Sequence, residues 1–183
     1  MCATDSSSPR TTPVTFILTE HRLVTVRYDE PKPFMLVAAK LARSCAPHIT
    51  GDMVLLELLD GIIDRCADIL ERVGGEVDNV SNEIFEPSAD RGHARKYSQI
   101  LLTIGRGDLT SKVRESLVSI GRVISFVTVE TETASRWTKE QRAQFKTQQR
   151  DVQSLTDHAS YLSSKITFVL DAMLGVVNLE QNN

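Results

Sequence analysis

The stretch FKTQQRDVQSLTDHASYLSSKITFVLDAMLGVV, from Phe145 to Val177, decides the fold because its apolar residues recur at alternating steps of three and four. Such steps place one narrow stripe along a helix, as in a coiled coil. We therefore predict a long helix over residues 138–183 that packs against copies of itself or against the helices before it. Its one polar stripe member, Gln148, is expected near a wetter end. The stripe, called the seam below, comprises Phe145, Gln148, Val152, Leu155, Ala159, Leu162, Ile166, Val169, Met173 and Val176.

The last part of this helix becomes apolar on nearly every side, as Phe168, Leu170, Leu174 and Val177 illustrate. A coiled coil in water has no need of such a surface, whereas contact with lipid would explain it. No run of about 20 uninterrupted apolar residues occurs, so the chain as given is not expected to cross a membrane itself.

Two more long helices are predicted before the seam. The apolar residues of the first are Leu55, Leu59, Ile62, Cys66, Ile69, Val73, Val77, Val80 and Ile84. Those of the second are Tyr97, Leu101, Ile104, Val113, Leu117, Ile120, Ile124 and Val127. The tetrapeptide GRGD at Gly105–Asp108 is expected to kink the second helix, since it lacks the Gly-Lys-Ser/Thr that a phosphate-binding loop requires.

The N-terminal part predicts a β-hairpin. Residues 14–18 and 23–28 are β-rich runs separated by a polar turn, and Val24, Val26 and Tyr28 alternate onto one face that should be buried. Pro31 and Pro33 end the hairpin, and a short helix over 35–46 follows. The fold class is thus α+β and mostly α: a short hairpin, then long helices ending in a coiled-coil-like stalk helix. We expect a disordered leader over 1–13, a partial cytoplasmic domain over 14–137 and the stalk helix over 138–183.

Composition excludes several classes of function. The 183 residues carry 21 basic and 24 acidic side chains, a net charge of −3, so no basic field favours nucleic acid and none is expected as a partner. Three scattered cysteines fit a reducing compartment. The four histidines fall in different predicted elements and no nucleophile motif is present, so no catalytic residue is assigned and the chain is not expected to be an enzyme.

An acidic flank follows the first long helix, formed by Glu57, Asp60, Asp64, Asp68 and Glu71. It is either a solvated face or a weak site for a hard cation such as magnesium, which takes carboxylate oxygens and retains water. Cys66 lies on the apolar stripe and is interpreted as a small core residue.

Three segments resemble the CorA family of divalent-cation channels. VTFILTEHRLVTVRY, residues 14–28, is similar to the central hairpin of its cytoplasmic domain. KVRESLVSIGRVISFV, residues 112–127, resembles its helical region, and DHASYLSSKITFVLDAMLGVVNLEQN, residues 157–182, resembles the stalk helix entering the first membrane span. The family pattern extends further at both ends, with earlier strands and helices and with later spans that carry a Gly-Met-Asn signature.

The resemblance implies a homopentamer whose stalk helices surround a pore, attached to the bacterial inner membrane through the missing spans, with this part facing the cytoplasm and soluble alone. This arrangement agrees with the seam, which by its spacing predicts stalk packing at Leu155, Leu162, Ile166, Val169 and Met173. Asn182 matches an asparagine at the cytoplasmic mouth of the pore, against the alternative that it belongs to a merely polar end. Magnesium is the expected transported and regulatory ion, with Asp157 and Asp171 as candidate ligands. Related ZntB proteins move zinc, so zinc or cobalt stays open. The rival interpretation is a soluble helical oligomerisation or interaction module without a transport role.

Overall fold

The computed structural model describes residues 10–20, 22–43, 48–85, 93–133 and 137–181. Within these, two strands precede four helices, which confirms the predicted hairpin and mostly helical class. The elements are β1 (Val14–Leu18), β2 (Leu23–Arg27), α1 (Lys32–Arg43), α2 (Gly51–Phe85), α3 (His93–Thr133) and α4 (Lys139–Gln181).

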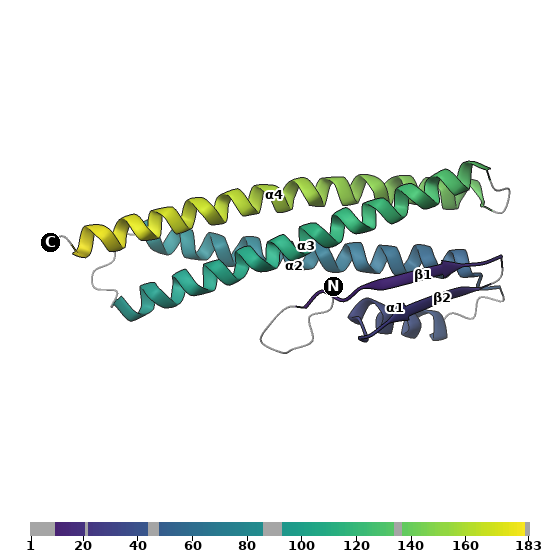
Figure 1. Ribbon diagram of the computed structural model, residues 1–183, viewed down its shortest axis with the longest axis horizontal. Coiled ribbons are helices and arrows are strands. Elements are labelled where there is room, and N and C mark those ends of the chain that lie inside the picture. The colour runs from purple at the N-terminus through teal and green to yellow at the C-terminus, as the bar shows by residue number, and fades with distance from the viewer. Residues whose placement is uncertain (1–9, 21, 44–47, 86–92, 134–136, 182–183) are drawn as a thin grey trace.

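Helices α2, α3 and α4 form a long bundle, with the hairpin and α1 beside the end at which α4 begins (Figure 1). Side-chain contacts define their directions. Lys165 of α4 pairs with Asp78 of α2, and Gln148 lies beside Asp60, so α2 and α4 run parallel with a nearly constant offset in sequence. The intervening α3 runs antiparallel to both, as its short connections require.

The predicted stripe of α2 is confirmed. Its members are buried, with Ile84 partly so: Leu55, Leu59, Ile62, Cys66, Ile69, Val73, Val77 and Val80. The helix continues through Gly74 and Gly75, although glycine costs about 1 kcal/mol per residue in a helix relative to alanine. A Cβ atom at Gly74 would lie 3.6 Å from Cδ2 of Leu162, so this glycine sits under the seam of α4.

The prediction for α3 is wrong at Leu101 and Ile104, and the side chain of Tyr97 lies outside the described residues. Leu101 and Ile104 are exposed, and Thr103 and Thr110 are buried instead. Each threonine hydroxyl donates to a carbonyl of its own helix one turn earlier, at 2.8 Å, so burial leaves neither hydroxyl unsatisfied. The later residues Val113, Leu117, Ile120, Ile124 and Val127 are buried as predicted. The α-helix is unbroken through Gly105–Asp108 and runs without an evident bend in Figure 1.

The hairpin turns the other face inward. In the antiparallel ladder, in which Val14 pairs with Arg27 and Leu18 with Leu23, the side chains of Val14, Phe16, Leu18 and Leu23 pack on the core. The expected buried trio of Val24, Val26 and Tyr28 is exposed instead.

The inward face of the hairpin rests on α1. The Phe16 ring stacks on Phe34 at 6.3 Å, and the guanidinium of Arg27 lies 4.5 Å from the centre of the Phe34 ring. Helix α1 begins at Lys32, earlier than predicted, because Pro33 is compatible with a first helical turn. Residues 44–47, which include the predicted end of this helix, lie outside the described residues.

Candidate functional site

Helix α4 begins with a capping box. The Thr138 backbone N–H donates to Oε1 of Gln141 at 2.9 Å, and the Gln141 N–H donates to Oγ1 of Thr138 at 3.2 Å. Nε2 of Gln141 also donates to Oδ2 of Asp52, at 2.7 Å, in the first turn of α2. The start of α4 is therefore tied to the start of α2.

The seam of α4 faces α2 and α3 of the same chain, one of the two arrangements expected. Its members Leu162, Ile166, Val169 and Met173 are buried and Leu155 is partly buried. Two glycines of α3, Gly107 and Gly121, allow α3 and α4 to approach closely. A Cβ atom at Gly121 would lie 3.3 Å from Cγ1 of Val152, and one at Gly107 would lie 3.5 Å from Cγ2 of Ile166. The seam is occupied within the chain and is not a free surface for other copies.

Gln148 does not lie at a wet end, contrary to expectation. It is 1% exposed, and its Nε2 donates to the Leu56 carbonyl at 3.0 Å and lies 3.4 Å from Oδ1 of Asp60. A buried polar contact in an otherwise apolar seam fixes the register of paired helices. Gln148 thus holds α4 against α2 at one position along the bundle.

A second stripe lies on the roughly opposite side of α4, again at alternating steps of four and three. We call it the outer stripe. Its exposed members in the structure are Asp157, Tyr161, Ser164, Phe168, Asp171, Gly175 and Asn178. Because the same steps continue from Asn178 to position 182, Asn182 falls on the outer stripe by sequence, although it lies outside the described residues. Asp157 and Asp171 therefore share one side of α4. The same sequence period predicts this stripe and includes position 182, although the prediction of the seam did not consider it.

The C-terminal part of α4 exposes apolar side chains around the outer stripe, including half-exposed Leu174 and more exposed Leu179. An 18-residue window within Lys139–Leu179 has a mean hydropathy of 1.4, and 22% of it is buried. By length and composition, α4 is apolar enough to cross a membrane.

The candidate metal ligands do not form a site within one chain. Asp157, which accepts a hydrogen bond from Nε2 of Gln153 at 3.0 Å, and Asp171 are both exposed. They are separated along α4 by about 20 Å at 1.5 Å per residue, so they cannot share an ion. Among the residues that the structure describes, no three His, Cys, Asp or Glu side chains are grouped to hold a metal ion.

The acidic flank of α2 is partly neutralised by Lys40. Glu57 pairs with Lys40 of α1, which raises the pKa of that lysine. The pKa of Asp64 is raised by burial and by the nearby carboxylates of Asp60, Asp68 and Asp151. Repulsion between these carboxylates is a cost that a counter-ion would reduce.

Cys66 is fully buried, and burial raises the pKa of its thiol to about 11. The thiolate is the reactive form of cysteine. The side chain is therefore a protonated core residue, as interpreted from its place on the stripe.

Comparisons with known proteins identify the family. The family model described as "CorA-like Mg2+ transporter protein" matches residues 1–183. The magnesium transport protein CorA of Haemophilus ducreyi is 28% identical over 182 residues, which are 99% of this chain and 55% of that protein. The protein of the same name from Salmonella typhimurium is 28% identical over 171 residues, 92% of this chain and 51% of its own length.

The fold agrees with a solved structure of the CorA magnesium transporter from Methanocaldococcus jannaschii. The TM-score is 0.66 at 17% sequence identity, over 93% of this chain and 56% of that one. The chain thus spans about half the length of the relatives it matches. The matching family is one of transporters and not of enzymes, and this chain belongs to the CorA-like Mg2+ transporter family.

Proposed function

We propose that this chain is the cytoplasmic and stalk part of a CorA-type magnesium channel, that it takes part in gating and pentamer assembly, and that it does not transport ions alone. The observation that carries the proposal is the two-sided character of α4. One side is packed into the bundle, and the other is exposed and increasingly apolar toward Leu179. A helix that leaves a bundle to enter lipid has this distribution.

Assembly follows from the outer stripe. Because α2 and α3 cover the seam, copies that surround a common axis have to meet through the opposite side of α4. Gly175 and Ser164 are small enough for helices to approach closely there. Around such an axis the copies of Asp171, and those of Asn182 beyond it, form rings.

These rings suit a hydrated ion. Magnesium dehydrates reluctantly, and carboxylate and amide oxygens can hold it through its bound waters. The magnesium ion therefore passes Asp171 and Asn182 with most of its hydration shell in place. Asp157 lies further from the membrane on the same stripe and is the second candidate for regulatory binding between copies. Cobalt and zinc remain alternative cargoes, since nothing in these side chains excludes them.

The proposal divides the chain at residue 138. Residues 14–137 form part of the cytoplasmic domain, and residues 138–183 form the stalk that leads to the bacterial inner membrane. The rival is a helical oligomerisation or interaction module without transport, and it is favoured by the fact that the described bundle has its own buried core.

The genomic DNA on both sides of the coding region distinguishes the channel from the interaction module. Two apolar spans with Gly-Met-Asn downstream support the channel, and an immediate stop codon in several related genomes favours the module. The longer protein should also restore growth of a magnesium-uptake-deficient bacterium at low magnesium, and the 183-residue chain should not.

Cysteine cross-linking tests the assembly surface. In a background with Cys2 and Cys45 replaced by serine, Ser164→Cys on the outer stripe should form disulfide-linked dimers under oxidation. Ser111→Cys, at a position of α3 that is also exposed, is the matched control and should stay monomeric. Equal cross-linking of both variants would remove the outer stripe from the proposal.

Sedimentation tests the ion. Millimolar magnesium should shift the chain toward the oligomer, since an ion held between copies promotes their association. Asp171→Ala should weaken that shift. An association state indifferent to magnesium in both proteins would leave the regulatory role unsupported.

A further inference from the structure

Four glycines lie at nearly one height of the three-helix bundle. They are Gly74 and Gly75 of α2 and Gly105 and Gly107 of α3. A Cβ atom added at Gly74 would lie 3.6 Å from Cδ2 of Leu162, and one added at Gly107 would lie 3.5 Å from Cγ2 of Ile166. Because Leu162 and Ile166 are about one turn apart on α4, the glycines of both other helices lie beside the same stretch of α4.

Packing explains two of these glycines and leaves the other two unexplained. At Gly75 and at Gly105 an added Cβ atom would meet no atom of the described residues within 4 Å, so neither position needs a glycine for close approach. Glycine disfavours a helix relative to alanine because its backbone has more freedom to lose. What Gly75 and Gly105 share is their height, at which they weaken the backbones of α2 and α3 together.

Helix α4 carries hydroxyl side chains at the same height. Within about two turns, four of them donate to the carbonyl oxygen four residues earlier, at 2.9 to 3.2 Å: Ser160, Ser163, Ser164 and Thr167. Such hydroxyls compete with the N–H groups of the helix for its carbonyl oxygens and often bend the helix. All three helices therefore carry residues that ease bending at one height. We call this height the joint, formed by residues 74–75 of α2, 105–107 of α3 and 160–167 of α4.

Two ion pairs link the helices at the joint. Arg106 of α3 pairs with Glu76 of α2, and Lys165 of α4 pairs with Asp78 of α2. Interdigitated apolar side chains resist any change of angle between helices, whereas a long, flexible side chain such as lysine can keep its partner through a small change. The ion pairs therefore hold the helices together where their backbones are weakened.

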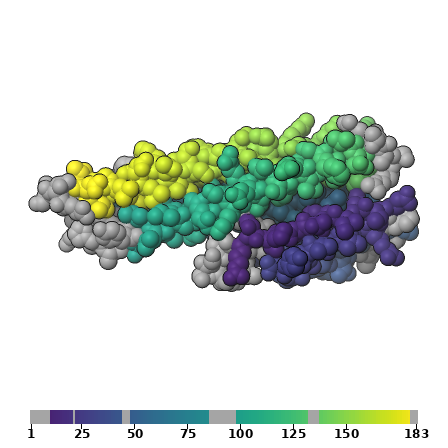
Figure 2. All heavy atoms as spheres, viewed as in Figure 1, coloured from purple at the N-terminus to yellow at the C-terminus, as the bar shows by residue number. Residues whose placement is uncertain are grey.

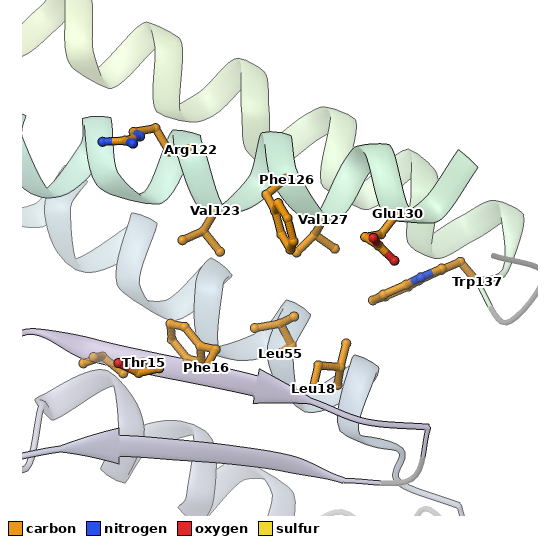
Figure 3. Close-up of a pocket in the computed structure, with 11 residues that line it drawn as sticks. Thr15, Phe16, Leu18, Leu55, Arg122, Val123, Phe126, Val127, Glu130 and Trp137 are labelled. Carbon is orange, nitrogen blue, oxygen red and sulfur yellow. The ribbon is translucent and has the colours of Figure 1, made fainter. Parts of the chain in front are cut away.

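The hairpin covers the bundle on one side of the joint. Figure 2 shows the purple hairpin against the half of the bundle at which α4 begins, while the yellow end of α4 and the teal start of α3 extend beyond it. Within the covered half, Phe16 of β1 lies opposite Val127 of α3, beside Leu55 of α2 (Figure 3). Residues 11–14 line one cavity with Glu115 of α3, and Gly107 lies eight residues beyond Glu115, about 12 Å further along α3. The cover by the hairpin therefore ends before the joint begins.

We propose that the joint is a bending point of the bundle, at which its two halves change their angle while each half keeps its own packing. The hairpin half consists of β1, β2, α1 and the parts of the three long helices beside them. The C-terminal half contains residues 168–181 of α4 with the end of α2 and the start of α3. Helix α3 runs without an evident bend through the joint in Figure 1, so bending leads to a second arrangement. The proposal goes beyond transport, because a soluble module with this bundle would bend in the same way.

Amide hydrogen exchange on the whole protein tests the weakness of the joint. Helix amides exchange when their hydrogen bonds open locally, so the amides of residues 160–167 should exchange at least about tenfold faster than those of residues 145–152 on the same helix. Equal exchange in the two stretches would overturn the proposal.

A double variant tests whether the three helices open together. Gly75→Ala with Gly105→Ala alters only α2 and α3, yet it should slow the exchange of residues 160–167 of α4 at least about fivefold. Ser119→Ala is the matched control, because it also favours the helix at an exposed position of α3 but lies about 20 Å from Gly105. Slower exchange confined to α2 and α3 would overturn the common joint. Equal slowing by Ser119→Ala would assign the effect to overall stability and would also overturn it.

Spin labels measure the bending itself. With accessible cysteines replaced by serine, labels at Val24→Cys on β2 and Leu101→Cys on α3 place one exposed reporter on each half. The distribution of distances between the labels should be at least about 1.5-fold broader in the parent than in the Gly75→Ala, Gly105→Ala variant. Distributions of equal width would show that the halves keep one angle and would overturn the proposal.

Discussion

Leu162→Ala tests whether the seam of α4 carries the stability of the bundle. Leu162 is 2% exposed and sits over Gly74 of α2. The substitution removes about three carbon groups, worth roughly 0.8 kcal/mol each, or about 2.4 kcal/mol of transfer free energy. The cavity left behind adds to this, so the loss in the free energy of unfolding should reach about 3 to 5 kcal/mol. For a chain of this size that corresponds to a fall of roughly 6 to 15 °C in Tm.

The neighbouring glycine provides a compensating change. Gly74→Ala should stabilise the parent by about 1 kcal/mol, since alanine is the better helix former and the new methyl has room at 3.6 Å from Leu162. In the Leu162→Ala background the same methyl also fills part of the cavity, so the gain should be larger by about 0.5 to 1 kcal/mol. A double-mutant cycle from urea unfolding followed by circular dichroism measures this coupling.

Leu174→Ala is the matched control, because it makes the same chemical change on the same helix at a half-exposed position. It should cost no more than about 1 kcal/mol, in proportion to its smaller buried area. Equal losses for Leu162→Ala and Leu174→Ala would show that the seam does not pack as described.

Three further substitutions test particular contacts, each by urea unfolding. Gly51→Ala should destabilise the chain by about 1 to 3 kcal/mol, because the added Cβ atom would lie 2.8 Å from backbone atoms of the hairpin. At Gly75 an added Cβ atom meets no atom within 4 Å, so Gly75→Ala is the matched control and should stabilise the chain. Gln148→Ala should cost about 2 to 3 kcal/mol through its lost hydrogen bond to the Leu56 carbonyl and the cavity created; a loss below about 0.5 kcal/mol would contradict its role in register. Asp64→Asn should stabilise the chain at pH 7 by less than about 1 kcal/mol. The pKa of the Asp64 carboxyl is raised in the folded state, so its ionisation lowers stability as pH rises above the ordinary pKa of an aspartate. The benefit of Asp64→Asn should therefore disappear near pH 3, where the parent carboxyl is protonated in both the folded and the unfolded state.

The helices could be predicted from sequence where one period continued without interruption. The stripe from Leu55 to Val80 and the seam of α4 are such cases, and their burial follows the pattern closely. The prediction failed at Leu101 and Ile104 because it counted apolar side chains and gave threonine no weight. A threonine hydroxyl bonded to its own helix is buried at little cost, so Thr103 and Thr110 set the inward side of α3.

The hairpin and the candidate site show a different limit. Leu23 and Val24 are equally apolar, and a period of two cannot decide which set of alternate residues faces inward when both sets include apolar side chains. The contact between Phe16 and Phe34, which decides it, joins separate elements. For the same reason the seam of α4 did not reveal its partner: alternating steps of three and four predict a packed side, not the chain that packs on it.

The two stripes of α4 constrain how a signal could pass along the proposed stalk. The seam is in close contact with α3 at Gly107 and Gly121 and is held in register with α2 at Gln148. Rotation of α4 alone would bring Val152 against the backbone of α3 and expose buried seam residues such as Leu162 and Ile166, at a cost similar to several core substitutions. Any change at Asp171 on the outer stripe that depends on rotation of α4 therefore requires α2 and α3 to move with it. An ion bound between copies would then act on whole bundles and their angles to the axis, rather than on stalk helices that turn independently.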